Sequence, residues 1–280
     1  MREVAEAGAL KLWIRSARAE GRRIGLVPTM GYLHDGHLAL VDEARRRADA
    51  VVMSVFVNPL QFGPSEDFER YPRDLDRDRR LASERGVDLL FVPSLAAMYP
   101  PGTDTRVVPG PASQQWEGAA RPGHFAGVLT VVAKLFHLVE PDVACFGQKD
   151  IQQVTLVRHM IRDLDMPVQV AVVPTVREPD GLALSSRNLY LDPSDRRDAL
   201  ALSRGLRQAS LAWAAGERRG PALEACIERE LGGTRAVRVD YIAAIDPEHL
   251  ERVAEAPAGT ILAVAARVGR TRLIDNLILE

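Results

Sequence analysis

The 280-residue sequence has few cysteines, few aromatic residues and no long apolar run. Its two cysteines, Cys145 and Cys226, lack the spacing of a metal-ligand set, and a disulfide between them is not expected. No run of about 18 uncharged apolar residues occurs, so we expect no transmembrane helix and no membrane partner. Glu3 and Glu6 interrupt the N-terminal stretch, which therefore does not resemble a signal peptide. We accordingly expect a cytoplasmic protein.

The sequence also lacks a strong net charge. It has 36 Lys+Arg and 38 Asp+Glu, which gives a formal net charge of -2. A general basic surface for nucleic acid is therefore not expected, and any anion site must be local. Lysine is scarce, because arginine takes every cationic position except Lys11, Lys134 and Lys149. A lysine beside a candidate site is thus a mild hint that a compact ammonium group is needed there.

An apolar content of 46% with 26% charged residues is typical of a folded protein with a real core. Short apolar runs that predict buried strands cover residues 24–27, 50–57, 88–92, 143–147 and 168–173. Helical patterns alternate with them over residues 2–20, 37–48, 74–85, 125–139 and 149–163. This alternation predicts a parallel sheet with helices on both faces, in an α/β domain of residues 1–175.

The pattern changes in the C-terminal part of the sequence. Helical patterns over residues 193–216 and 221–231 are followed by three alternating segments, at residues 237–245, 260–268 and 272–279. Such alternation is typical of a small antiparallel sheet. The sequence therefore predicts a second, smaller α+β domain of residues 176–280.

The most informative stretch is PTMGYLHDGHLALV, residues 28–41, where a strand ends and a helix begins. His34 and His37 lie at the opening of that helix, and unpaired N–H groups at a helix N-terminus attract phosphate. Gly36 between them lets a nucleotide approach the backbone. A plainer interpretation makes Asp35 a helix cap beside two surface histidines. A zinc site is disfavoured, because no third ligand lies at a usual spacing.

Two further stretches follow predicted strands. In SVFVNPLQFG, residues 54–63, the amides of Asn58 and Gln61 could bind hydroxyls or a carboxylate, although an ordinary Asn-Pro turn is the simpler interpretation. The Gly- and Pro-containing segment 63–69 is a candidate gate. Because ligands of parallel sheets bind beyond the carboxyl ends of the strands, we expect the loops that leave these strands to meet at one cleft.

In CFGQKDIQQV, residues 145–154, Gly147 opens a turn and Lys149 begins a helix. Lys149 could neutralise charge on a phosphate, and Asp150 could accept a hydrogen bond from a ribose hydroxyl. Gln153 lies one helical turn farther on, so it can face the same cleft. The alternative is a solvated helix start in which Asp150 is a favourable first-turn charge.

The fourth stretch is VREPDGLALSSRN, residues 176–188, at the predicted domain junction. Ser185, Ser186 and Arg187 form a compact set of donors that suits a triphosphate tail, and the alternative is a polar linker. Arg121 and His124, in the Gly- and Pro-containing sequence RPGHFAG, are weaker candidates without an assigned role.

Together and in this order, the four stretches resemble those of the pantothenate synthetase family, within a superfamily of adenylate-forming nucleotidyltransferases. The resemblance implies a Rossmann-like N-terminal domain, a smaller domain that closes over the nucleotide, and a homodimer. It also implies that the protein joins pantoate to β-alanine and splits ATP, with Mg²⁺, to AMP and pyrophosphate through a pantoyl-adenylate. The product would be pantothenate, the vitamin used to make coenzyme A.

The resemblance further implies a role for each matching residue. ATP phosphates would be bound by His34, His37 and Lys149, with the triphosphate tail on Ser185, Ser186 and Arg187. Pantoate would be held by Gln61 and Gln153, with Met30 beside both ligands. The ribose and adenine would be lined by Gly147, Asp150 and Val176. Leu184 and Ile151 depart from the usual residues of the family at these positions, which affects packing only.

Two alternatives remain open from the sequence. Another nucleotidyltransferase of the superfamily would share the histidine motif, and a regulator that binds nucleotide without catalysis would share the fold. Protein ligands for a metal are not identifiable from the sequence.

Overall fold

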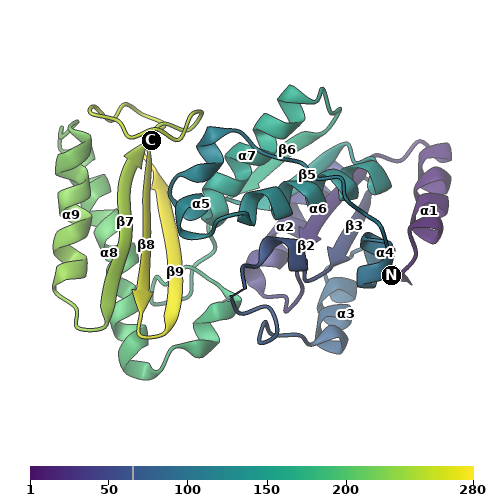
Figure 1. Cartoon of the computed structure of the whole chain (residues 1–280), viewed down its shortest axis with the longest axis horizontal. Helices are drawn as coiled ribbons and strands as arrows, with labels where there is room; N and C mark the ends of the chain where they lie inside the picture. The colour runs from purple at the N-terminus through teal and green to yellow at the C-terminus, as the bar shows by residue number, and fades with distance from the viewer. Residues whose placement is uncertain (65) are drawn as a thin grey trace.

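A computed structural model describes residues 1–64 and 66–280, so that Ser65, in the candidate gate, lies outside the described residues. The described chain contains a six-stranded parallel sheet and a three-stranded antiparallel sheet (Figure 1). Helices cover both faces of the parallel sheet, as in Rossmann-like folds. The predicted fold class is therefore confirmed.

The order in which the chain adds strands to the parallel sheet reverses at one of the two middle strands. Its strands are β1 (Arg2–Val4), β2 (Ile24–Thr29), β3 (Ala50–Val55), β4 (Leu89–Phe91), β5 (Val143–Gly147) and β6 (Gln169–Val173). They pair in the order β1-β4-β3-β2-β5-β6. The chain thus proceeds outward from β2 through β3 to β4 and then returns to the other side of β2 with β5. Ligands of open α/β sheets bind at such a switch point, which here lies between β2 and β5.

Each face of the parallel sheet has its own hydrophobic core. One face packs against α1 (Ala7–Ala19), α6 (His124–Val139) and α7 (Ile151–Asp163), and the other packs against α2 (Asp35–Arg47) and α3 (Leu75–Glu84). Successive side chains of a strand point to opposite faces. Leu26 accordingly joins the core on the α6 side and Val27 the core on the α2 side.

Two predicted helices begin later than the sequence pattern indicated. Residues 2–20 were expected to be helical throughout, but Arg2–Val4 pair with β4 at the edge of the sheet and α1 starts at Ala7. A strand of three residues is too short to show a periodic pattern in the sequence. Its conformation is decided by the strand with which it pairs. The helix expected from Lys149 begins instead as a 3₁₀ turn, η3 (Gln148–Asp150), with α7 starting at Ile151.

Several short elements had no counterpart in the prediction. They are the helices α4 (Leu95–Met98) and α5 (Glu117–Ala120), and the 3₁₀ turns η1 (Pro59–Gln61), η2 (Pro111–Gln114) and η4 (Ser186–Tyr190). One-turn elements such as these depend on the surfaces against which they pack.

The C-terminal part packs on both faces of its sheet. The strands β7 (Val237–Ile245), β8 (Ile261–Val268) and β9 (Thr271–Ile278) pair antiparallel in that order. On the outer face lie α8 (Pro193–Ala214) and α9 (Gly220–Gly232), and the parallel-sheet body lies on the other face (Figure 1). Ala263 and Ile245 join the core that contains α6. Burial on two faces explains why β8 is almost continuously apolar.

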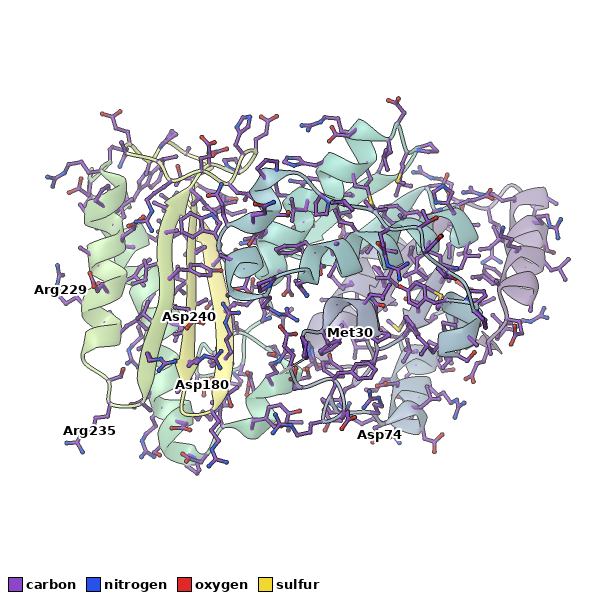
Figure 2. The ribbon with its side chains drawn as sticks, in the orientation of Figure 1. Met30, Asp74, Asp180, Arg229, Arg235 and Asp240 are labelled. Atoms are coloured by element: carbon purple, nitrogen blue, oxygen red, sulfur yellow. The ribbon has the colours of Figure 1, made fainter. Side chains whose placement is uncertain are left out.

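Figure 2 labels side chains at the edge and near the centre of the view. Arg229 and Arg235 extend from the outer edge of the C-terminal part, whereas Met30 lies near the centre of the view (Figure 2). No helix within residues 1–64 and 66–280 combines the length and the apolar character needed to cross a membrane. The predicted boundary at residue 176 falls just after β6.

Candidate active site

The loop after β2 is shaped by a glycine and by a carboxylate from α3. Gly31 and Tyr32 both have positive φ, at 84° and 52°. A Cβ on Gly31 would lie 2.8 Å from Val55 Cγ1 and 2.9 Å from Asp78 Oδ2, so the position requires glycine for space as well as for conformation. Asp78 accepts hydrogen bonds from the N–H groups of Tyr32 at 2.8 Å and Leu33 at 2.7 Å. The buried Asp78 carboxylate therefore holds the loop that leads to the histidines.

His34 and His37 lie against each other at the start of α2, with ring centroids 4.1 Å apart. The His34 N–H donates to Nδ1 of His37 at 3.3 Å, so a neutral His37 carries its proton on Nε2. Burial, followed by the charge of Lys149, lowers the pKa of His34 to about 4. Burial also holds the pKa of His37 well below its usual value. Both rings are therefore neutral near pH 7 and can donate an N–H without carrying charge.

Lys149 lies across the switch point from these histidines. It follows β5 in η3, and its side chain is 20% exposed with Nζ 3.8 Å from Asp150 Oδ2. The positive charge of Lys149 is one cause of the low pKa of His34 and of His37, after burial. The first and third predicted motifs therefore meet, because β2 and β5 are neighbours in the sheet.

The second motif is buried more deeply than the sequence indicated. Gln61 is 9% exposed, and its Nε2 donates to Met30 Sδ at 3.1 Å. Asn58 is 1% exposed, and its Nδ2 donates to Gln61 Oε1 at 3.2 Å and to Gly127 O at 3.1 Å. Tyr99 donates to Asn58 Oδ1 at 3.0 Å. Asn58 thus orients the amide of Gln61, and its expected contact with the substrate stays a prediction.

The fourth motif contacts the candidate gate, through Asp67, and the segment directly after it, through Tyr71. Arg187 makes a two-point ion pair with Asp67, at 3.0 and 3.1 Å. Ser186 Oγ lies 3.4 Å from the hydroxyl of Tyr71, and Ser185 Oγ accepts from the Arg187 N–H at 3.3 Å. The pair with Asp67 was not predicted from the sequence, because a partner 120 residues away leaves no local signal.

The adjoining leucine brings this motif to the histidine loop. Leu184 Cδ2 lies 3.9 Å from the position that a Cβ on Gly36 would occupy. The Leu184 N–H also donates to the carbonyl of Val176 at 2.9 Å, so Val176 lies beside the same segment. The first and fourth motifs are therefore neighbours as well.

A cavity of about 500 Å³ lies between the two parts of the chain, a size within the usual range for small-molecule sites. Its wall includes the predicted residues Lys149, Asp150, Gln153, Ser185 and Arg187. The other predicted residues are not among the described residues that line this cavity. They are Met30, His34, His37, Asn58, Gln61, Gly147, Val176 and Ser186.

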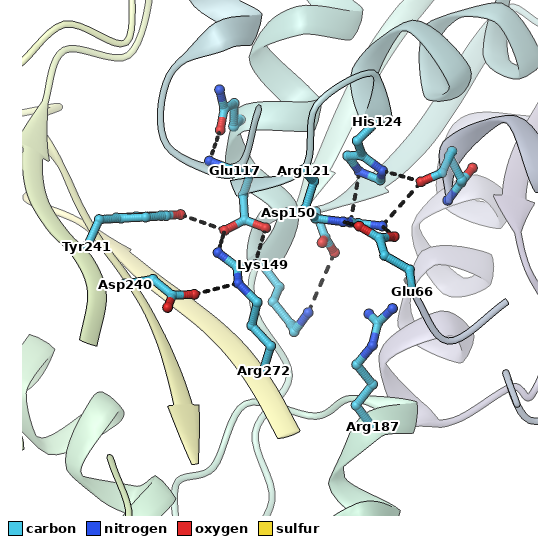
Figure 3. Close-up of polar contacts among 12 residues, drawn as sticks. Glu66, Glu117, Arg121, His124, Lys149, Asp150, Arg187, Asp240, Tyr241 and Arg272 are labelled. Atoms are coloured by element: carbon cyan, nitrogen blue, oxygen red, sulfur yellow. Dashed lines mark hydrogen bonds and ion pairs between the residues drawn. The ribbon is translucent and has the colours of Figure 1, made fainter. Parts of the chain in front are cut away.

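A buried ion pair that no sequence motif indicated lies on the cavity wall. Glu117 accepts from Arg272 Nη1 at 2.6 Å and Nη2 at 2.7 Å, and from the hydroxyl of Tyr241 at 3.0 Å (Figure 3). Arg272 Nε also donates to Asp240 Oδ2 at 2.7 Å. Burial raises the pKa of Tyr241 well above its usual value, so its hydroxyl remains a donor. This cluster joins α5 to β7 and β9, and no local motif could reveal partners 155 residues apart.

Arg121 and His124, which had no assigned role, support the loop that carries Gln61. Arg121 pairs with Glu66 at 2.7 and 2.8 Å, and its Nη1 lies 3.1 Å from His124 Nε2 (Figure 3). His124 Nδ1 lies 2.8 Å from the Gln61 carbonyl oxygen. Burial and the Arg121 charge lower the pKa of His124 to about 4, so the neutral ring donates from Nδ1 and accepts at Nε2.

The chain is similar to proteins of known activity over nearly its whole length. The profile of the family "Pantoate-beta-alanine ligase" matches residues 2–278. A pantothenate synthetase of Moorella thermoacetica is 51% identical over 272 residues, covering 97% of this chain and 96% of the relative. A pantothenate synthetase of Chloroflexus aurantiacus is 54% identical over 267 residues, with 95% of each protein covered.

Two solved structures are similar as well. The pantothenate synthetase of Thermus thermophilus superposes with a TM-score of 0.95 at 52% identity, covering 100% of this chain and 99% of that one. A pantoate-beta-alanine ligase of Francisella tularensis, complexed with "Beta-gamma ATP" and β-alanine, has a TM-score of 0.82 at 33% identity, with coverages of 99% and 97%. These similarities extend through both sheets and the cavity between them, and the chain belongs to the pantoate–β-alanine ligase family.

Proposed function

We propose that this ligase makes pantothenate through a pantoyl-adenylate formed in the cavity between its two parts. Family membership supplies the overall reaction, the ATP-dependent joining of pantoate and β-alanine. The observation that carries the site assignment is that Lys149, on the cavity wall, follows β5, which pairs with β2, the strand whose loop leads to His34 and His37. The ligands of the Francisella relative support ATP and β-alanine as occupants of this cavity.

The first step is attack of a pantoate carboxylate oxygen on the α-phosphorus of ATP. The bond between that phosphorus and the bridging oxygen breaks, and pyrophosphate leaves. Gln61 and Gln153 orient pantoate, with Met30 packed against the Gln61 amide. Lys149 neutralises charge that grows on the phosphate, and the neutral imidazoles of His34 and His37 donate N–H bonds to its oxygens. The rate enhancement rests on alignment and electrostatics.

The nucleotide lies between the third and fourth motifs. No atom of the described residues, apart from those of the adjoining residues, lies within 4 Å of the position that a Cβ on Gly147 would take, so a ligand can approach the backbone there. On the family resemblance, we assign Asp150 and Val176 to the ribose and adenine. Ser185, Ser186 and Arg187 receive the triphosphate tail. The Arg187 guanidinium is paired with the Asp67 carboxylate. When the triphosphate tail binds, a phosphate replaces this carboxylate as the partner of Arg187. A guanidinium binds carboxylate and phosphate in the same two-point geometry.

The second step is attack of the neutral β-alanine amine on the carbonyl carbon of the adenylate. The bond from that carbon to the phosphate oxygen breaks, AMP leaves, and the amine proton passes to solvent. Neither step needs a covalent enzyme intermediate, so an activated serine or cysteine is not required. The Ser185 and Ser186 hydroxyls therefore act as hydrogen-bond donors only.

We include Mg²⁺ with the ATP. Among the described residues, His, Cys, Asp and Glu do not gather in any group of three that could hold a metal. That arrangement fits magnesium, which is usually held by substrate phosphates and water with one or two carboxylates. The ion would offset phosphate charge, and Asp150 is the carboxylate beside Lys149. We also propose a homodimer in the cytoplasm, on the family resemblance alone.

A product assay with ATP, pantoate and β-alanine tests this function. We expect AMP, pyrophosphate and pantothenate in equal amounts, together with pantoate-dependent exchange of pyrophosphate into ATP. Exchange that depends on a phosphorylated acceptor instead would indicate another nucleotidyltransferase. ATP binding without AMP release under any of these conditions would indicate a regulator without catalysis.

Variants test the assigned residues. Lys149→Ala should lose roughly 100- to 1,000-fold in adenylation rate, because one preorganised contact contributes about 2.7–4 kcal/mol to the barrier. Lys149→Arg should not restore the rate, since a guanidinium is planar and larger than an ammonium. His34→Ala and His37→Ala should also slow this step. Wild-type rates of pantoyl-adenylate formation would remove these residues from the proposed site.

A further inference from the structure

The turn that carries Lys149 is held by an amide from the C-terminal sheet. Asn276, on β9, is 2% exposed. Its Nδ2 donates to the carbonyls of Gln148 and Lys149, both at 2.9 Å, and its Oδ1 accepts from Gln148 Nε2 at 3.3 Å. The Asn276 amide thus uses its donor and its acceptor on one three-residue turn that is more than 120 residues distant in sequence.

The position of Asn276 on its strand explains how it reaches that turn. Residues two apart on a strand share a face, so Arg272 and Asn276 point to the same side of β9. Arg272 contacts Glu117 from this face, and Asn276 contacts the Lys149 turn. On the opposite face, Asp275 pairs with Arg177 at 2.6 and 3.0 Å. The strand is therefore anchored on both sides of Asn276.

We infer that Asn276 is a positioning residue for Lys149 in the adenylation step. This inference rests on the proposed function of Lys149. The two carbonyls that accept from Asn276 belong to η3, a single turn between β5 and α7 with Asp150 at φ -96° and ψ 55°. The Asn276 bonds fix the backbone from which the long lysine side chain starts, and they exist only where the C-terminal sheet is docked.

The expected effect follows from the sensitivity of catalysis to geometry. A displacement of about 1 Å can cost on the order of 100-fold in rate when the group must meet a developing charge. Loss of the Asn276 amide should therefore slow adenylation while leaving attack of β-alanine on preformed pantoyl-adenylate nearly intact. KM for β-alanine should stay near the wild-type value.

The test uses the full-length Asn276→Leu variant, which has a similar side-chain volume without donor or acceptor. We expect single-turnover formation of pantoyl-adenylate to fall roughly 10- to 100-fold, and the second step to change less than about threefold. The control is Thr155→Val, which removes the 3.1 Å bond from Thr155 Oγ1 to Pro247 O, another contact between the two parts. The control should adenylate at the wild-type rate.

Combination with Lys149→Ala separates positioning from general support. If Asn276 acts through Lys149, the double variant should be no slower than Lys149→Ala alone. Additive losses would overturn the inference and leave the proposed function standing. An equal loss in Thr155→Val, or a wild-type rate in Asn276→Leu, would overturn it as well. A wild-type adenylation rate in Lys149→Ala would refute both proposals.

Folding of the variants is checked by thermal melting. Should Asn276→Leu fail to fold, Asn276→Ser applies the same criteria, because its shorter hydroxyl leaves at least one of the two carbonyls without its donor. A folded Asn276→Ser protein with unimpaired adenylation would contradict the inference.

Discussion

Burial shifts the pKa of several side chains in this protein, and His124 is one of them. Burial and the charge of Arg121 lower the pKa of its imidazole to about 4. The neutral ring bridges Arg121 and the Gln61 carbonyl. Protonation would place a second positive charge beside Arg121, so this residue should make folding sensitive to mild acid.

We predict that stability falls as the pH drops from about 6.5 toward 4, because the unfolded chain protonates His124 at a higher pH than the folded protein. The stabilisation is fully present above the unfolded pKa and is lost through the folded pKa. His124→Asn keeps an amide donor for the Gln61 carbonyl and does not titrate, so its melting temperature should decline less over this interval. Thermal melting of both proteins checks this, and parallel curves would contradict it.

Among the elements, α3 has a role that its amphipathic pattern did not suggest. Its buried Asp78 accepts the two N–H groups that turn the histidine loop. Burial raises the pKa of Asp78, yet both bonds are charge-assisted as long as the carboxylate is ionised. The element thus links the packing of one face of the sheet to the geometry of His34 and His37.

Asp78→Asn should destabilise the protein by about 1.5–3 kcal/mol, because one buried N–H loses its acceptor and meets an amide donor instead. Turnover should fall too, as the histidine loop loses its support. The control is Asp74→Asn at the exposed N-cap of the same helix, which accepts from the Arg77 N–H at 3.1 Å. This variant should cost about 1 kcal/mol or less and leave turnover unchanged. Urea unfolding and steady-state kinetics distinguish the two.

Elements with a periodic pattern or an apolar run were predictable from the sequence, and short elements without either were not. Five of the six parallel strands and the five large helices of the N-terminal part follow from helical periodicity or from apolar runs, and the apolar run of β4 was recognised although that strand has only three residues. In contrast, β1 and η3, also of three residues each, show neither signal. Their conformations depend on contacts with β4 and with Asn276, which lie far away in the sequence.

For the whole molecule, the contact between its two parts determines whether the cavity exists. Glu117 and Arg272 are buried on the cavity wall, with side chains 10% and 17% exposed. Removal of Arg272 alone leaves the buried Glu117 charge without compensation, whereas removal of both leaves only the more exposed Asp240 without its partner. The stability of the docked arrangement should therefore depend on the pair and not on either residue alone.

We predict that Arg272→Gln lowers the free energy of unfolding by about 3–5 kcal/mol and that adding Glu117→Gln recovers a large part of this loss. KM for ATP should rise in the single variant, because the cavity wall is disturbed. A double-mutant cycle in urea, with the ATP dependence of turnover, measures both effects. Additive single losses would show that the two side chains are not coupled.

The sequence by itself determined the fold class, the order of the chemical motifs and the family, because strand and helix periodicity and the residues of each motif are local properties of the chain. Only the tertiary structure decided which other residues they contact, and through which atoms. It buried Asn58 against Gln61, paired Arg187 with Asp67, and brought Glu117 to Arg272 and Asn276 to the Lys149 turn. These partners are separated by up to 155 residues, and pairing over such distances is set by the docking of one sheet beside another.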